Sequence, residues 1–153
     1  MGISHREIAD SWVAFNSEGE YNRSERSGFN VYYRGDTIYS YGSHFPIASF
    51  ATGPTGERVV LFTDRSYSFS TAKHKGIVNR ALGYRLTLNV ADPSSRCWSR
   101  LAEECAGKAK ALRESAKRRR SDWRREHDEE QAAGYTKSAQ LFRCWANAAR
   151  KAA

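Results

Sequence analysis

The sequence predicts an α+β fold: a small, mainly antiparallel sheet with short helices, followed by a C-terminal helical hairpin. Residues 29–90 contain short runs rich in β-branched and aromatic residues, separated by glycine and proline turns. Beyond residue 93, apolar residues recur every three or four positions, which is the period of an amphipathic helix. We therefore expect an α+β domain over residues 1–92 and a basic helical hairpin or arm over residues 93–153.

The N-terminal segment contains a helix-start signal. In Ser4-His5-Arg6-Glu7 the serine has the position of a helix cap, and the glutamate three residues later can reach back to it. The apolar residues that follow at helical spacing extend this helix over residues 5–15. Residues 16–28 are polar and interrupted by glycines, which predicts a loop.

Four strands are expected between residues 29 and 90. Gly35-Asp36 separates the first two and is typical of a β-hairpin turn. The third is a compact apolar run after a Gly-Pro-Thr-Gly turn, and the fourth alternates apolar with polar residues. The predicted strands are 29–34, 37–41, 58–63 and 84–90.

One further helix is expected between the last two strands. Ser70 or Thr71 can cap its start, and it runs to about Leu82. Gly83 then stands where helices commonly end. We expect the two short helices to pack on the sheet.

The C-terminal arm is predicted to be two helices joined near Gly134, because that glycine interrupts two apolar stripes. Asp92-Pro93 precedes the arm. The first stripe consists of Trp98, Leu101, Cys105, Ala109, Leu112 and Ala116, and the second of Leu141, Phe142, Trp145, Ala148 and Ala149.

Positive charge is concentrated in the arm. The net charge of +8 divides into +1 for residues 1–93, with 10 Lys+Arg and 9 Asp+Glu, and +7 for residues 94–153, with 15 and 8. Such a balance favours polyanionic partners. No signal peptide and no apolar run of about 18 residues is visible, and the three cysteines form no Cys-x-x-Cys pair. We expect a cytoplasmic protein of a bacterial host cell, with no membrane partner, cofactor or metal.

Lys117-Arg118-Arg119-Arg120 is the most informative feature of the arm. Successive helical residues point about 100° apart, so four in a row face all sides. Either the helix leaves the core there, or an anionic group packs against it. Trp123, Arg124 and Arg125 follow; arginine suits phosphate, and tryptophan can stack on a base. These seven residues are the predicted nucleic-acid contacts, with a solvated helix face or an acidic protein partner as alternatives.

Two histidines, His44 and His74, lie among hydroxyl-bearing residues. A helix N-terminus attracts anions, so Ser70, Thr71, Lys73 and His74 form a predicted anion site. If His44 and His74 share one site, their rings should lie within about 8 Å, and they could act as general acid and base on a phosphodiester without a metal. The alternative is that both are structural.

Two segments resemble a small domain that recurs in phage and plasmid genomes. They are Tyr41-Gly42-Ser43-His44-Phe45-Pro46 within residues 38–48, and Tyr67-Ser68-Phe69-Ser70-Thr71-Ala72-Lys73-His74. The resemblance covers roughly residues 28–80. It implies a mobile-element origin, carries no catalytic residue, and does not extend to the arm.

These patterns favour a nucleic-acid-binding accessory protein of a phage or similar element, which contacts DNA or RNA phosphates through the basic helix. The first alternative is a phage-encoded inhibitor that binds a host defence complex, in the manner of an anti-CRISPR protein. The second is a small metal-independent phosphodiesterase that uses His44 and His74.

Overall fold

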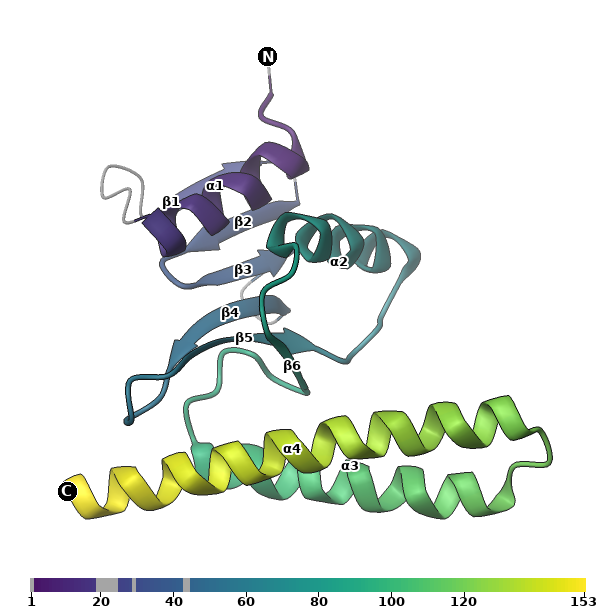
Figure 1. Cartoon of the computed structure of the whole chain (residues 1–153). Helices are drawn as coiled ribbons and strands as arrows, with labels where there is room; N and C mark the ends of the chain where they lie inside the picture. Colours follow the sequence, from purple (N-terminus) through teal and green to yellow (C-terminus); the bar gives the residue numbers. More distant parts are fainter. Residues whose placement is uncertain (1, 19–24, 29, 43–44) are drawn as a thin grey trace. The chain divides into compact units, whose positions relative to one another are not determined.

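The computed structural model describes residues 2–18, 25–28, 30–42 and 45–153 (Figure 1). The predicted α+β class is confirmed: a six-stranded sheet with two short helices precedes two long helices. Contacts divide the chain into two compact units. Unit 1 comprises Met1–Ala51, Arg58–Thr87 and Ala91–Ser94; unit 2 comprises Thr52–Glu57, Leu88–Val90 and Ser95–Ala153. None of the helices in the described part of the chain combines the length and apolar character that a bilayer span requires.

Helix α1 (His5–Glu18) begins with the predicted capping box. The Ser4 N–H donates to Glu7 Oε2 at 2.8 Å, and the Glu7 N–H donates to Ser4 Oγ at 3.2 Å. Both residues thus satisfy backbone donors that the first turn of a helix leaves unpaired. The helix continues three residues beyond the predicted end at residue 15.

Strands β1 (Glu25–Gly28), β2 (Val31–Arg34) and β3 (Thr37–Ser40) pair antiparallel in sequence order. The predicted hairpin between β2 and β3 is confirmed. Its turn places Gly35 at φ +58°, a backbone conformation that glycine adopts at little cost. The predicted loop over residues 16–28 was wrong at both ends, because α1 runs to Glu18 and β1 pairs with β2.

Strands β4 (Pro46–Thr52), β5 (Arg58–Thr63) and β6 (Thr87–Val90) complete the sheet, in the order β1 to β6. Strand β4 was not predicted, because it is buried almost throughout and therefore lacks the alternation that marks a half-buried strand. The Val60 N–H donates to Leu86 O, and Thr63 Oγ1 donates to Ala91 O. Since these partners advance together along both segments, β5 and β6 run parallel.

Helix α2 (Phe69–Leu82) connects β5 to β6, as a crossover between parallel strands requires. Its cap is Ser68 and not Ser70 or Thr71: Ser68 has extended backbone angles, and its Oγ accepts from the Thr71 N–H at 3.1 Å. Gly83 ends the helix at φ +61°, as predicted.

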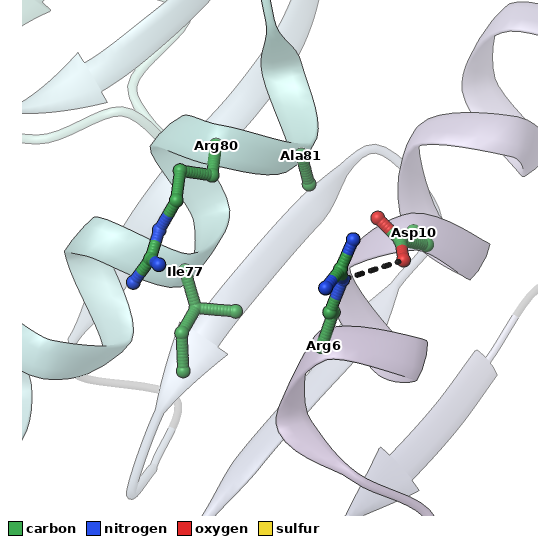
Figure 2. Close-up of a pocket in the computed structure, with 5 residues that line it drawn as sticks. All are labelled: Arg6, Asp10, Ile77, Arg80 and Ala81. Carbon is green, nitrogen blue, oxygen red and sulfur yellow. Dashed lines mark ion pairs between the residues drawn. The ribbon is translucent and has the colours of Figure 1, made fainter.

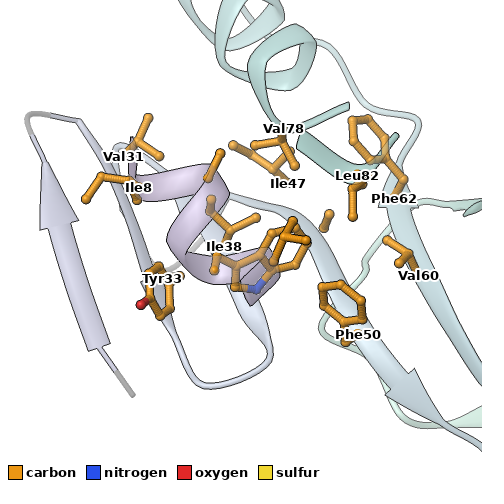
Figure 3. Close-up of a cluster of buried hydrophobic side chains, with 14 of the residues drawn as sticks. Ile8, Val31, Tyr33, Ile38, Ile47, Phe50, Val60, Phe62, Val78 and Leu82 are labelled. Atoms are coloured by element: carbon orange, nitrogen blue, oxygen red, sulfur yellow. The ribbon is translucent and has the colours of Figure 1, made fainter. Parts of the chain in front are cut away.

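The core of unit 1 is one apolar cluster built from α1, α2 and strands β2 to β5 (Figure 3). Trp12 is fully buried, and its ring centroid lies 4.8 Å from that of Phe50. The Trp12 indole N–H donates to Asp36 O at 3.0 Å, so the buried polar atom has a partner. These contacts fix α1 against the β2–β3 hairpin turn.

Helices α3 (Trp98–Arg118) and α4 (Asp122–Ala152) form the expected hairpin, but the predicted turn was in the wrong place. Gly134 lies inside α4, and the chain turns at residues 119–121. A glycine in a helix interior costs only about 1 kcal/mol relative to alanine, which a long packed helix can absorb. Arg119, by contrast, leaves the helical conformation with φ −74° and ψ 130°.

The facing surfaces of α3 and α4 are rich in small residues, which let two helices approach closely. Near the first turn of α3, this interface contains an aromatic cluster in which the ring centroid of Trp145 lies 4.8 Å from that of Trp98 and 5.9 Å from that of Phe142. The buried residues are Leu101, Ala102, Cys105, Ala109 and Ala116 on α3, and Asp128, Ala132, Ser138, Ala139, Phe142 and Trp145 on α4.

Trp145 also anchors the β4–β5 turn, which belongs to unit 2. Its indole N–H donates to Glu57 Oε2 at 3.1 Å. Gly53 packs so closely on the indole that an added Cβ would lie 2.1 Å from Trp145 Cε2. Only glycine fits here without displacing the tryptophan.

We predict opposite effects for two glycine-to-alanine substitutions in unit 2. Gly53→Ala should lower the free energy of unfolding by about 1–3 kcal/mol, because the added methyl overpacks the Trp145 contact. Gly134→Ala should raise it by about 0.5–1 kcal/mol, because its Cβ meets nothing within 4 Å and the helix gains propensity. Urea unfolding measures both; a neutral Gly53→Ala would contradict the close packing.

Candidate nucleic-acid interface

A buried carboxylate organises the turn between α3 and α4. Asp128 is 6% exposed, and its Oδ2 accepts hydrogen bonds from Arg119 Nε at 2.9 Å and from Ser115 Oγ at 3.0 Å. Ser115 lies in the last turn of α3 and Arg119 directly follows that helix, so one carboxylate ties the end of α3 to the start of α4. Both outcomes considered for the basic run therefore occur: α3 ends at Arg118, inside the run, and the Asp128 carboxylate packs against Arg119.

The same contacts set the charge state of Asp128. The hydrogen bond from Arg119 lowers the pKa of Asp128 below its ordinary value, against the opposing effect of burial, and the hydrogen bond from Ser115 lowers it further. The carboxylate is therefore ionised at neutral pH and holds Arg119 as an ion pair. Arg119, one of the predicted phosphate contacts, is thus already paired with a carboxylate of the protein itself.

Arg125 is also engaged within the turn. Its Nη1 donates to Asp122 Oδ1 at 3.2 Å, and its Nη2 donates to Arg119 O at 3.1 Å. The bond from Nη2 provides a hydrogen-bond donor for the carbonyl oxygen of Arg119, the first residue after α3. Arg125 is therefore a structural residue of the turn in this conformation.

The other five predicted contacts all face solvent. Trp123 is 67% exposed, and the Arg124 guanidinium lies 5.4 Å from its ring centroid, within cation–π range. Among the described residues, no carboxylate forms an ion pair with any of the four cations of this set. We call this set the hairpin tip: Lys117, Arg118, Arg120, Trp123 and Arg124.

Two residues of the turn were missed from the sequence. Ser121 has the N-cap position of α4, yet its side chain makes no capping bond, and its buried Oγ lacks a hydrogen-bond partner within the described residues. The Ser121-Asp122 pair is a helix-start signal that could have located the turn. Asp128 gave no such signal, because its role depends on a contact across the turn.

His74 is buried in unit 1. It is 5% exposed, its Nδ1 is 2.7 Å from Ser40 Oγ, and its ring contacts His5 at 4.7 Å between centroids. Burial, and then the charges of His5 and Lys73, lower the pKa of His74, so the ring is neutral at pH 7. His44 lies outside the described residues, so a shared site for His44 and His74 stays a prediction.

The predicted anion-binding residues occupy different environments. Thr71 is buried, and its Oγ1 lies 3.0 Å from Ser68 Oγ, whereas Ser70 is half-buried. Lys73 is exposed, and His74 is directed to Ser40. The four side chains do not all converge on the N-terminus of α2, and an anion site there stays a prediction.

A second place where cations lie close together is a cavity of about 180 Å³ between α1 and α2 (Figure 2). Arg6 on its α1 side is paired with Asp10 at 3.8 Å, and Arg80 on α2 donates to Gly76 O at 3.3 Å. Both arginines thus have local partners, and the volume is below the roughly 300–1,000 Å³ of small-molecule sites. It is a weaker candidate than the hairpin tip.

Within the described residues, no three His, Cys, Asp or Glu side chains are grouped so that they could hold a metal ion. Comparison with protein-family models, with curated proteins and with solved structures found no match for this chain. The assignment of a site therefore depends on the geometry described above.

We predict that Arg119 and Asp128 contribute to stability in a pH-dependent way. Because the folded-state pKa of Asp128 is lowered, its contribution is complete above the unfolded value of about 3.9 and is lost as the pH falls through the folded value. Asp128→Asn should therefore lower the melting temperature at pH 7 and lose that effect in strong acid. Arg119→Gln should also destabilise at pH 7, whereas the matched Arg120→Gln should not; equal effects of the two would contradict the assignment.

Proposed function

We propose that this protein binds nucleic acid through the hairpin tip. The observation that carries the proposal is the presence of four exposed cations beside an exposed tryptophan, at the end of a helical hairpin whose turn is fixed by Asp128. Exposed cations without carboxylate partners can neutralise phosphates and release condensed counterions. A rigid turn holds them in place, which reduces the entropy lost on binding.

Charge balance in the turn supports a polyanionic partner. Residues 117–125 contain six Lys and Arg residues and one carboxylate. Internal hydrogen bonds engage two of the arginines, Arg119 and Arg125. The remaining four are the cations of the hairpin tip, and they supply the proposed phosphate contacts.

Trp123 favours a single-stranded or locally unpaired target. An aromatic ring with most of its surface in water can stack on any base, and the neighbouring Arg124 extends the contact by its own planar group. In a regular duplex the bases are already stacked, so the ring would gain less. The proposal therefore places bases on Trp123 and phosphates on the surrounding cations.

The accessory role in a phage or similar element is part of the same proposal, and it comes from the sequence resemblance alone. An inhibitor of a host defence complex would use the same cations against an acidic protein surface. The two functions differ in whether purified nucleic acid binds at all, and the experiments below separate them.

We predict that the variant Lys117→Gln, Arg118→Gln, Arg120→Gln, Arg124→Gln loses most of its affinity for duplex DNA. Each phosphate contact contributes about −0.9 to the slope of log K against log salt, so the slope should become shallower by roughly 3.6 if all four engage. Glutamine is a good helix former, so folding should be retained. Fluorescence anisotropy over a salt series measures the slope.

The matched control removes four exposed cations of unit 2 outside the tip: Lys110, Lys137, Arg143 and Lys151. Its net charge is the same as that of the tip variant, so a specific interface predicts a much smaller change in slope. Equal slopes for the two variants would show that the tip contributes only its share of the net positive charge and is not a specific interface. If the wild type binds neither DNA nor RNA at low salt, the inhibitor function takes its place.

We predict that Trp123→Ala discriminates between single-stranded and duplex targets. The substitution should cost roughly 1–3 kcal/mol of binding free energy on a single-stranded oligonucleotide, because one base loses its stacking partner. Duplex affinity should change little, and so should the melting temperature, since the side chain is 67% exposed. Equal losses on both targets would show that Trp123 supports the shape of the tip and does not stack on a base.

A further inference from the structure

Unit 1 contains a cavity that is separate from the residues of the hairpin tip. Its volume is about 350 Å³, and its lining comes from the end of β3 with the residue after it, from the residue before β4, and from the N-terminus of α2 with the two residues before it. Small-molecule sites have volumes of roughly 300–1,000 Å³. We call it the hydroxyl pocket, after the groups that its lining residues share: Ser40, Tyr41, Tyr67, Ser68 and Thr71, with Phe45 beside them.

Two tyrosines of the pocket expose much of their rings. Tyr41 is 54% exposed and Tyr67 is 68% exposed, and both belong to the few large hydrophobic residues that the described chain leaves in solvent. Phe45 is buried and supports Tyr67 with an edge contact at 4.9 Å. Aromatic rings held this way present faces on which a planar ligand can stack.

Tyr41 is placed there against a backbone preference. Its φ is +64°, in the left-handed region that bulky residues rarely adopt, and its N–H donates to Asn30 O at 2.8 Å. Strained residues persist where the surrounding structure fixes them, and they are concentrated at ligand sites. The exposure and the strain at Tyr41 are two separate observations on the same side chain.

The polar side of the pocket is pre-positioned. Ser40 and Thr71 are buried, and their hydroxyl groups are oriented by His74 Nδ1 at 2.7 Å and by Ser68 Oγ at 3.0 Å. A hydroxyl can donate and accept, so the hydroxyl groups of Ser68 and Thr71 can match the mixed donors and acceptors of a heteroaromatic edge, whereas Ser40 is 0% exposed and bonds to His74 within the wall. Among the described residues that line the pocket there is no carboxylate, so these residues offer an anionic ligand no repulsion.

The N-terminus of α2 adds a preference for negative charge. Ser68 is both a lining residue and the cap of this 14-residue helix. The helix dipole attracts anions, and so do the N–H groups of the first turn other than that of Thr71, which donates to Ser68 Oγ. Lys73, on the same helix, is exposed and adds a positive charge nearby.

From this combination we propose that the hydroxyl pocket binds a nucleotide, with the base against Tyr41 and Tyr67 and the phosphate toward the N-terminus of α2. Stacking faces, neutral hydroxyl groups and a helix N-terminus each match one part of that ligand. The ligand is either a free nucleoside monophosphate or an unpaired residue of a strand. The site does not depend on the hairpin tip, and either can exist without the other.

The test is calorimetric titration of the full chain with the four common ribonucleoside monophosphates, with inorganic phosphate and with the matching nucleosides. Monophosphates should bind more tightly than either part alone. Tyr67→Ala should weaken binding by roughly 5- to 150-fold, the loss expected for one base-stacking contact. Tyr84→Ala is the matched control, because Tyr84 is a fully exposed tyrosine that does not line the pocket.

A second variant tests whether a loss of nucleotide binding comes from a lost contact or from a disturbed fold. Thr71→Val preserves the side-chain shape and removes the hydroxyl, so it should weaken binding while the circular dichroism spectrum stays that of the wild type. Repeating the titration with Trp123→Ala tells the two sites apart, since the pocket should retain its affinity when the tip is altered. No binding of any monophosphate, equal binding by wild type and Tyr67→Ala, or equal affinity for inorganic phosphate alone would overturn the proposal.

The two sources of the nucleotide are separated with a short single-stranded oligonucleotide and the tip variant with four glutamines. If the strand still binds this variant and Tyr67→Ala abolishes that binding, the pocket accepts a residue within a strand. If only monophosphates bind, the ligand is the free nucleotide. Both results support the pocket, and neither depends on the function proposed for the tip.

Discussion

The contact of Arg119 and Ser115 with Asp128 decides which residues of the basic run are available to a partner. Two donors from the end of α3 meet one buried carboxylate at the start of α4. Removing Arg119 would leave the buried Asp128 carboxylate without its charged partner, which is costly in a protein interior. The turn is therefore fixed at residues 119–121. Fixing it there directs Lys117, Arg118 and Arg120 outward.

This arrangement separates structural from available charge within a run of four similar residues. All four residues are cations at adjacent positions, but Arg119 stands at the end of α3 and pairs with Asp128. Arg125 is likewise engaged within the protein, because its Nη2 donates a hydrogen bond to the carbonyl oxygen of Arg119. A basic run seen in a sequence is thus an upper bound on the contacts that it can make with phosphates.

Local signals predicted much of the fold, because they depend on neighbouring residues. The Ser4–Glu7 capping box, the Gly35 turn and the Gly83 helix end all involve groups within a few positions of each other. The turn predicted near Gly134 was wrong for the opposite reason. A glycine costs a helix little, and the packing of α4 on α3, which is not local, keeps the helix continuous through Gly134. Strand β4 was missed because burial on both faces removes the alternation of a half-buried strand.

The candidate sites follow the same division. The solvent-facing residues of the hairpin tip were predictable from residue type and spacing, whereas Asp128 and the link between Ser40 and His74 join positions 9 to 34 residues apart. The hydroxyl pocket likewise combines three segments of the chain. Its hydroxyl-bearing residues are visible in the sequence, but the cavity exists only once the strand and the helix have been brought together.

Helix α4 has 31 residues and α3 has 21, and this difference has a consequence for local stability. With a rise of about 1.5 Å per residue, α4 extends roughly 15 Å beyond the length that α3 can cover. No residue of α4 after Trp145 is fully buried, and only Ala146 and Ala148 are half-buried, so its last two turns depend more on intrinsic helix propensity than the rest of the helix does. Ala146, Ala148 and Ala149 supply that propensity, and Arg150 and Lys151 complement the negative end of the helix dipole. The two parts of one continuous helix therefore differ in local opening energy: the part that packs on α3 is stabilised by tertiary contacts, and the part beyond Trp145 has fewer of them.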